Sequence, residues 1–345
     1  MTHVQLRNGK HFPIVAGQSI LDAAEAAGLA LEHSCRSGRC GSCRTTVTAG
    51  RTVALRAEEG LTPDEARAGT VLSCARGAQT DLQLDLDDLG ALAGIRRATV
   101  PCRIHALQLL APDVLQVQLR LPPTAAWRHL AGQHVQVIAP GGLRRAYSLA
   151  NASGPAGQPV LLLLHIRRVP GGAMSGYWFE RARPGDLLRL DGPLGSFYLR
   201  DCAGRDLVFL ATGTGYAPIA AMLQDLAERP AAAQPRSLQL LWGARQARDL
   251  YAAPRHPGLP GLQYTPVLSR AGADWTGARG HVQDLLLQQP HEWSRTQVYA
   301  CGSPAMVQAA RQRLLQAGLP AQYCFTDAFV ASDSPAGAAT AALPA

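Results

Sequence analysis

Three kinds of hydrophobic pattern follow one another along the 345 residues of the chain. In the first, short alternating runs at 4–6, 11–15 and 82–86 predict strands. A capping box that begins at Ser19 predicts a helix over 20–27, which ends at Gly28. This first part of the chain is therefore expected to combine a small sheet with one short helix.

From about Pro101, longer runs of alternating apolar and polar residues are separated by turns rich in proline and glycine. Strands are predicted at 114–121, 134–138, 160–169 and 187–191. Since no helical pattern interrupts these runs, they favour an antiparallel β-barrel.

The last third alternates strands with helices. Strands are predicted at 207–211, 238–242, 264–268 and 298–301, and helices at 219–227 and 304–317. Ser303 is expected to cap the second helix, with Pro304 in its first turn and Gly318 after its end. Such repeated units predict a parallel sheet, whose ligands bind at the carboxyl ends of the strands.

The chain is thus predicted to be a multidomain protein of α+β and α/β class. The expected domains are residues 1–92, 99–202 and 203–331, and a tail rich in Ala, Ser, Pro and Gly at 332–345 is predicted to be disordered.

Composition excludes several other classes of protein. With 47% hydrophobic and 17% charged residues, the chain can bury sizeable cores. Its apolar runs, such as 160–164 and 207–211, are far shorter than the roughly 18 to 20 residues that cross a bilayer. The first residues also lack the pattern of a secretory signal. We therefore expect no membrane span and a cytoplasmic location.

The net charge of +8 is unevenly distributed. Residues 1–95 carry −2, residues 96–202 carry +8 and residues 203–345 carry +2. Only 6% of residues are aromatic and the arginines are spread through strand-like segments, which argues against nucleic-acid binding. A pocket for a phosphate-bearing cofactor, or a face for an acidic partner, explains the charge better.

Four of the eight cysteines form a pattern that indicates metal chemistry. They are Cys35, Cys40, Cys43 and Cys74, and the first three have the C-x4-C-x2-C spacing of plant-type ferredoxins. Gly38 and Gly41 supply the backbone freedom with which a loop can curl around a cluster. A structural zinc site and a disulfide are the alternatives, but zinc sites usually pair two similar knuckles, and disulfides are rare in the cytosol.

On this spacing, the first 90 or so residues resemble a plant-type [2Fe–2S] ferredoxin domain. The resemblance implies that the cluster is bound by Cys35, Cys40, Cys43 and Cys74.

Two short motifs lie in the predicted barrel: Arg145-Ala146-Tyr147-Ser148, and the glycine-containing segment 165–175. In this order they resemble the R-x-Y-S and G-x-x-S elements of the ferredoxin–NADP reductase family, whose barrel binds FAD or FMN, with FAD favoured here. The flavin contacts that the resemblance implies are Arg145, Tyr147, Ser148, His165, Arg167, Gly171, Gly172, Met174 and Ser175.

Physical chemistry fits several of these implied roles. Arg145 can bind flavin phosphate oxygens with two donors, and Tyr147 offers a flat face to the isoalloxazine ring. Ser148 is expected near flavin N5, where it is a candidate catalytic residue. Gly171 and Gly172 allow the backbone to approach the pyrophosphate.

Two loops in the last third resemble the G-T-G-x-A-P and C-G-x-P-x-M loops of the same family. The resemblance implies that they bind NAD(P)H through Gly213, Thr214, Gly215 and Pro218, and through Cys301, Gly302, Pro304 and Met306. The segment 325–329 matches the C-terminal segment of the family near the flavin. Cys301 and Asp327 are further candidate catalytic residues, although Cys301 is also typical of a merely buried thiol.

The choice between the two dinucleotides stays open. Arg245 and Arg248 follow the 238–242 strand, where arginine can accept the 2′-phosphate of NADPH. Asp249, close by, is the residue type that selects the free ribose hydroxyls of NADH. The most similar families use NADH.

The order of the three modules resembles the iron–sulfur flavoprotein reductases of bacterial multicomponent systems, such as the CDP-6-deoxy-3,4-glucoseen reductases and the reductase components of oxygenases. This implies an oxidoreductase in which NAD(P)H, FAD and a 2Fe-2S cluster pass electrons to a dehydratase or oxygenase component. Two alternatives are an enzyme that reduces a bound substrate itself and a non-enzymatic redox sensor. The first would have little need for a ferredoxin domain, and the second none for nicotinamide loops.

Overall fold

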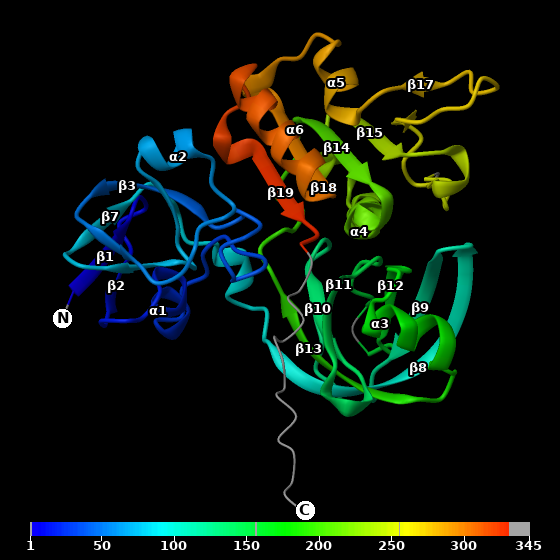
Figure 1. The fold of residues 1–345 in the computed structure, drawn as a ribbon, viewed down its shortest axis with the longest axis horizontal. Helices are drawn as coiled ribbons and strands as arrows, with labels where there is room; N and C mark the ends of the chain where they lie inside the picture. The colour runs from blue at the N-terminus through cyan, green and yellow to red at the C-terminus, as the bar shows by residue number, and fades with distance from the viewer. Residues whose placement is uncertain (1, 156, 255, 331–345) are drawn as a thin grey trace, which may run out of the picture.

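The computed structural model describes residues 2–155, 157–254 and 256–330, and the predicted disordered tail at 332–345 lies outside these ranges. Three main sheets follow one another along the chain. Figure 1 shows them as three domains, with the N-terminal domain beside the other two and the C-terminal domain above the barrel. The predicted fold class is confirmed.

The N-terminal domain is a five-stranded mixed sheet in the order β2-β1-β7-β3-β5. Its strands are β1 (Thr2–Leu6), β2 (His11–Ile14), β3 (Arg44–Ala49), β5 (Thr70–Leu72) and β7 (Leu82–Leu84), with a separate pair, β4 (Thr52–Ala54) and β6 (Arg76–Ala78). The helices are α1 (Ile20–Ala26) and α2 (Pro63–Arg67). The predicted cap of α1 is confirmed, because the Ser19 side chain accepts a hydrogen bond from the Asp22 amide at 3.1 Å.

The second domain is a six-stranded antiparallel barrel in the order β11-β10-β13-β8-β9-β12. Its strands are β8 (Ala98–Ala111), β9 (Val114–Arg120), β10 (His134–Ile138), β11 (Arg144–Ser148), β12 (Leu161–Arg167) and β13 (Leu187–Leu194). A bridge between Leu149 and Leu164 joins the two ends of the sheet. The short helix α3 (Ala173–Gly176) continues into a wider turn over Tyr177–Arg181.

The third domain is a six-stranded parallel sheet in the order β17-β16-β15-β14-β18-β19. Its strands are β14 (Asp206–Thr212), β15 (Ser237–Ala244), β16 (Leu262–Leu268), β17 (Ala278–Arg279), β18 (Thr296–Gly302) and β19 (Cys324–Ala328). The helices are α4 (Tyr216–Glu228), α5 (Val282–Leu287) and α6 (Pro304–Gln316). Ser303 caps α6 as predicted, with its hydroxyl accepting from the Met306 amide at 3.4 Å.

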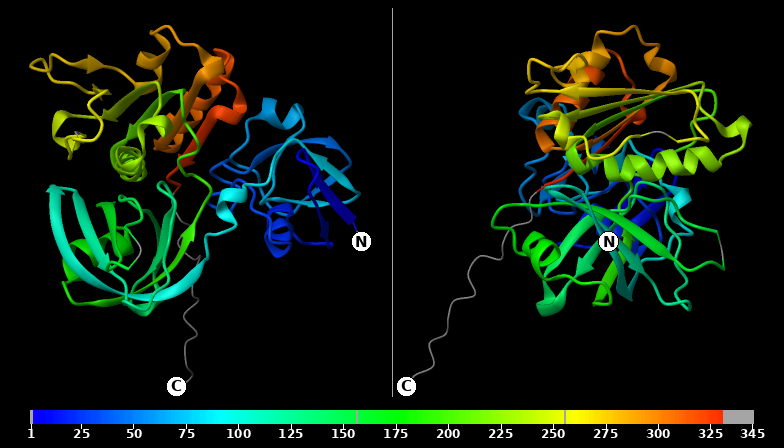
Figure 2. Two further views of the ribbon diagram at one scale, coloured as in Figure 1. Left: turned by 180° about the vertical axis from the view of Figure 1, so that it is seen from behind. Right: turned by 90° about the vertical axis from the view of Figure 1, so that its right-hand side faces the viewer.

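The domains share buried surface at two junctions. Figure 2 shows α4 on the side of its sheet that faces the barrel, and side chains from both domains form one core there. At the other junction β19, coloured red in Figure 1, lies beside the N-terminal domain. Within the described residues, none of the helices has the length and apolar character needed to cross a lipid bilayer.

Candidate functional site

The four cysteines of the predicted cluster site are free thiols that meet as two pairs. In the first pair, the amides of Cys35 and Cys40 each donate to the sulfur of the other residue, at 3.5 and 3.4 Å. In the second pair, the sulfurs of Cys43 and Cys74 lie 3.3 Å apart. Residues from the loop before β3 and from the end of β5 are thus brought together as the spacing predicts.

Backbone sterics fix the shape of this loop. Gly38 has a φ of +82°, and a Cβ there would lie 2.1 Å from the carbonyl oxygen of Ala57. A Cβ on Gly60 would lie 2.6 Å from the amide nitrogen of Gly41. Arg36 has a positive φ of 57°, which is uncommon for a residue with a side chain. Only glycine fits at these close approaches, so the loop holds the thiols in one arrangement.

The chemistry of the loop fits an anionic cluster of two irons. The hydrogen bond between the two side chains lowers the pKa of the Cys35 thiol and raises the pKa of the Cys40 thiol, so the pair shares one proton until iron, which binds thiolates, displaces it. Two bridged irons need two thiolates each, which is the grouping observed here. Four thiols that meet as two pairs therefore fit a binuclear cluster.

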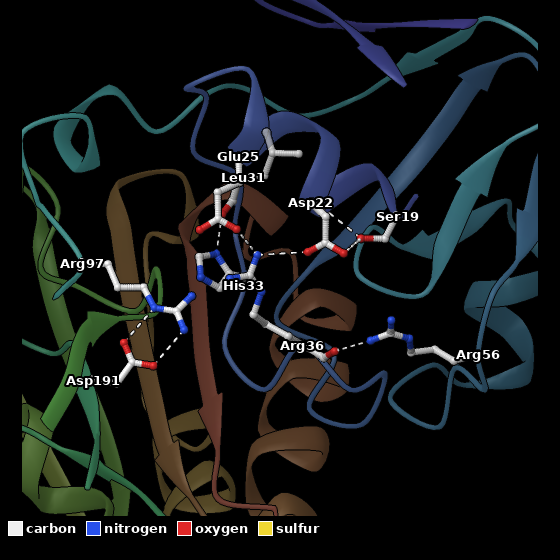
Figure 3. Close-up of polar contacts among 9 residues, drawn as sticks. All are labelled: Ser19, Asp22, Glu25, Leu31, His33, Arg36, Arg56, Arg97 and Asp191. Carbon is white, nitrogen blue, oxygen red and sulfur yellow. Dashed lines mark hydrogen bonds and ion pairs between the residues drawn. The ribbon is translucent and has the colours of Figure 1, made fainter. Parts of the chain in front are cut away.

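The arginines beside the cysteine loop have carboxylate partners. Arg36 reaches Asp22 at 3.2 Å and also Glu25, both on α1, as Figure 3 shows. Arg44 is 12% exposed and lies 3.1 Å from Glu65. These ion pairs connect the loop to α1 and α2, so the arginines stabilise the conformation of the loop.

In the barrel, the R-x-Y-S motif occupies β11. Tyr147 is half-buried, and its hydroxyl accepts a hydrogen bond from the indole of Trp178 at 3.1 Å. Ser148 is buried and points to the other face of the sheet, opposite His134 on β10. The predicted Tyr147 and Ser148 therefore lie on opposite sides of the same strand.

The glycine-rich segment after β12 forms a compact turn. Gly171 has a φ of +70°, which favours glycine. The Ser175 hydroxyl accepts from the Val169 amide at 3.1 Å and donates to the Val169 carbonyl at 2.8 Å. Both Met174 and Ser175 are buried in α3. The Ser175 hydroxyl therefore holds the turn between Val169 and α3 together.

Two of the predicted flavin contacts, Arg167 and His165, lie against the third domain. A Cβ on Gly213 would be 3.2 Å from the Arg167 Nη1. The Arg167 Nε lies 3.1 Å from the Asp113 carboxylate, whereas its Nη2 is buried with no hydrogen-bond partner among the described residues. Such an orphaned donor fits a phosphate oxygen. Burial lowers the pKa of His165 to about 4, and its ring nitrogen lies 3.2 Å from the Tyr251 hydroxyl.

The two predicted nucleotide loops pack tightly at the carboxyl edge of the parallel sheet. A Cβ on Gly215 would lie 2.2 Å from the Cys301 carbonyl oxygen. Gly302 has a φ of +139°, and a Cβ there would be 2.2 Å from the Thr212 hydroxyl. That hydroxyl accepts from the Ser303 amide at 3.0 Å. The glycines therefore allow the loops after β14 and β18 to form one surface, with Thr214, Pro218, Pro304 and Met306 in the same segments.

Cys301 and Asp327 face each other across β18 and β19. The Cys301 thiol is fully buried, and burial raises its pKa. Burial also raises the pKa of Asp327 to about 6, although a hydrogen bond from Ser34 at 2.6 Å opposes this shift. Asp327 therefore joins the third domain to the residue that precedes the first cysteine of the loop.

Some residues of the site carry no sequence signal. His134 lies beside Gly195, where a Cβ would be 2.7 Å from the imidazole Nδ1. Trp242 donates to the Gly213 carbonyl at 3.0 Å and stacks on Tyr216 with 4.3 Å between ring centroids. An aromatic residue inside a buried strand is typical of any core, so only the fold shows that Trp242 supports the loop.

Comparison with known proteins matches all three domains. Residues 4–78 match a 2Fe-2S iron-sulfur cluster binding domain, residues 101–198 an oxidoreductase FAD-binding domain, and residues 209–312 an oxidoreductase NAD-binding domain.

Individual relatives match over almost their whole length. The CDP-6-deoxy-L-threo-D-glycero-4-hexulose-3-dehydrase reductase of Yersinia pestis is 36% identical, covering 91% of this chain and 94% of the relative. Reductase component 2 of the terephthalate 1,2-dioxygenase of Comamonas is 33% identical, covering 92% and 94%. The crystal structure of a cytochrome P450 reductase of Amycolatopsis has a TM-score of 0.70 and 29% identity, covering 95% of this chain and 99% of that one.

Proposed function

The chain belongs to the iron–sulfur flavoprotein reductases, and we propose that it supplies electrons to a dehydrase that acts on a nucleotide-linked deoxysugar. It is an NAD(P)H-dependent oxidoreductase with FAD and a 2Fe-2S cluster, and it serves as the reductase component for a partner protein. The observation that carries the proposed partner is the identity of 36% with a 3-dehydrase reductase over 91% of this chain.

Three modules are required because their chemistry differs. NAD(P)H gives up a hydride, an iron–sulfur cluster carries one electron at a time, and a flavin can exchange either. The protein binds and orients these groups. The loops after β14 and β18 hold the dinucleotide at the edge of the sheet that faces the barrel, and β19, the last strand of that sheet, lies next to the cysteine loop.

We propose the following roles for the site residues from the matched domains and the geometry of the loops. Cys35, Cys40, Cys43 and Cys74 bind the cluster as two pairs. Arg145, Tyr147 and the turn at 171–175 bind the flavin, and Ser148 lies near its reactive edge. Gly213, Gly215 and Gly302 bring backbone close to the dinucleotide. The Arg167 Nη2 has no hydrogen-bond partner among the described residues, although the same guanidinium pairs with Asp113, and this nitrogen supports a contact with a cofactor phosphate.

The proposed partner is tested by reconstitution with two candidate acceptors. We expect product formation with a CDP-6-deoxy-L-threo-D-glycero-4-hexulose 3-dehydrase to be at least about tenfold faster than with a terephthalate dioxygenase component. A tenfold ratio of rates corresponds to a difference of ~1.4 kcal/mol in activation free energy. The control is reduction of a small one-electron acceptor at equal enzyme concentration. The reverse order of the two rates would instead indicate that the partner is an oxygenase. The chain is also 33% identical to the Comamonas reductase, which is a component of such a system.

The dinucleotide preference is tested at Arg245. Its carbonyl accepts from the Arg270 amide at 2.9 Å, so the two arginines follow neighbouring parallel strands, while the Asp249 carboxylate accepts from the Gln246 amide at 3.1 Å. We expect Arg245→Ala to lower kcat/KM for NADPH on the order of tenfold, because one phosphate contact is lost, and to leave NADH nearly unchanged. Arg236→Ala, before the other end of β15, is the control. An equal decrease of kcat/KM with both dinucleotides would show that Arg245 does not bind the 2′-phosphate.

A further inference from the structure

Arg200 lies in the segment that connects the barrel to the third domain. Its side chain is 14% exposed, and burial lowers its pKa, an effect that the Glu32 carboxylate opposes. Neither the sequence motifs nor the cofactor loops include this residue. A buried guanidinium is costly unless its surroundings compensate the charge, so each of its contacts is informative.

These contacts reach the N-terminal domain and the third domain, as well as the connecting segment itself. In the N-terminal domain, the Glu32 carboxylate lies 3.2 Å from the Arg200 Nη2. In the segment after the barrel, Nη2 also donates to the Ser196 carbonyl at 3.1 Å, and the guanidinium lies 3.5 Å from the centre of the Tyr198 ring. In the third domain, the Phe325 ring of β19 is 5.2 Å away.

The backbone of Arg200 is fixed as well. Its amide donates to the hydroxyl of Tyr299 at 2.9 Å, and Tyr299 is fully buried on β18 and stacked on Phe325 with 4.6 Å between ring centroids. The backbone of Arg200 is therefore anchored to the aromatic residues of the third domain.

The residues that follow Glu32 lead directly to the cysteine loop. The His33 amide donates to the Ser196 hydroxyl at 2.6 Å, and the Ser196 amide donates to the His33 carbonyl at 2.9 Å. The next hydroxyl, of Ser34, donates to Asp327 at 2.6 Å, and Cys35 follows. Arg200 thus binds the start of a four-residue segment, 32–35, that ends at the first cluster cysteine.

We infer that Arg200 is a positioning residue that holds the cluster loop at its working distance from the flavin and so sets the rate of electron transfer between them. The inference rests on the proposed assignment of the cluster to the four cysteines. It does not require Arg200 to touch either cofactor. Glu32 and the Tyr198 ring are the groups through which it acts.

The chain offers a matched control in Arg205. That arginine also stacks on a tyrosine, 4.1 Å from the centre of the Tyr323 ring, and donates to the same tyrosine's hydroxyl at 2.7 Å. Its partners lie within the third domain. Comparing Arg200→Ala with Arg205→Ala therefore separates loss of an interdomain contact from loss of a stacked arginine.

The test uses the holoenzyme under anaerobic single-turnover conditions. Mixing with NAD(P)H gives two rates, one for flavin reduction and one for cluster reduction. We expect Arg200→Ala to slow cluster reduction on the order of tenfold, because a released loop lets the cluster move away from the flavin and electron transfer becomes slower as that distance grows. Flavin reduction, iron content and flavin content should stay at the wild-type level. Hydrogen exchange of amides 32–35 should be faster in Arg200→Ala and unchanged in Arg205→Ala.

Two further variants, Glu32→Gln and Arg200→Lys, test the inference even if Arg200→Ala does not fold. Glu32→Gln removes the ion pair while the arginine stays, so it should show the same selective loss to a smaller extent, and Arg200→Lys should recover part of the rate. If Arg200→Ala does not fold, the Glu32→Gln result decides. Cluster reduction at the wild-type rate in Glu32→Gln and in any folded Arg200→Ala would overturn the inference. Wild-type protein without iron would instead refute the proposed cluster site.

Discussion

Replacing Cys40 with serine is expected to abolish one-electron output while NAD(P)H still reduces the flavin. Cys40 is 8% exposed and exchanges amide–sulfur hydrogen bonds with Cys35, so the change removes one thiolate from the first pair. Even groups that only orient metal ligands change affinity or activity by 10- to 100-fold. We therefore expect cytochrome c reduction to fall at least about 100-fold.

The same variant should keep most of its turnover with a two-electron acceptor, because the barrel and the third domain do not depend on the cluster for their chemistry. Cys102→Ala is the control, since Cys102 is also a buried thiol, in the core of the barrel. Equal loss of one-electron and two-electron activity in Cys40→Ser would contradict a relay that ends at the cluster.

The second large effect is expected at Arg145. One charge-assisted hydrogen bond from a guanidinium to a phosphate oxygen contributes ~1.5–3 kcal/mol. Arg145→Ala should therefore weaken FAD binding on the order of 100-fold, equal to ~2.7 kcal/mol. Equilibrium dialysis of the apoprotein against FAD measures this change.

The neighbouring arginine provides the control for that measurement. Arg144 is on the same strand but is exposed on the other face of the sheet, where it donates to the side chain of Gln136 at 3.3 Å. Arg144→Ala should bind FAD as the wild type does. Identical FAD affinity in the wild type and Arg145→Ala would show that Arg145 does not bind the flavin.

Several strands follow the ranges that their hydrophobic patterns predict, including β10, whose register with β13 shifts between His134 and Gln136. The range of β10 is predicted to the residue, and β9, β14 and β18 to within a few residues at each end. By contrast, β8 was not predicted, although it is the longest strand in the described ranges. Its register with β9 shifts near residues 104–106 and 109–111, and each shift breaks the alternation of inward and outward side chains.

Chemistry that depends on a fixed local spacing was also predictable. The C-x4-C-x2-C loop requires glycine at Gly38, and the structure explains this by the approach of the Ala57 carbonyl. Interdomain contacts had no such signal. His165 and Arg167 belong to the barrel sequence, yet they lie against Tyr251 and Gly213 of the third domain. Which residues meet across a junction depends on how the domains are oriented, and no local pattern encodes that.

The arginines of the middle domain lie in two places. Arg167 lies at the junction with the nucleotide loops, where Asp113 pairs with it at 3.1 Å. Arg103, Arg144 and Arg189 are instead exposed on strands of the barrel. The two uses suggested for this charge, a phosphate-bearing cofactor or an acidic partner, stay predictions.

The most direct test of the account is an anaerobic titration of the purified, reconstituted protein with NAD(P)H. We expect the flavin absorbance to bleach and the electron paramagnetic resonance signal of a reduced [2Fe–2S] cluster to appear in the same sample. Bleaching should persist in Cys40→Ser without that signal. A wild-type protein that binds neither flavin nor iron with sulfide, or whose cluster stays oxidised after the flavin is reduced, would contradict the relay.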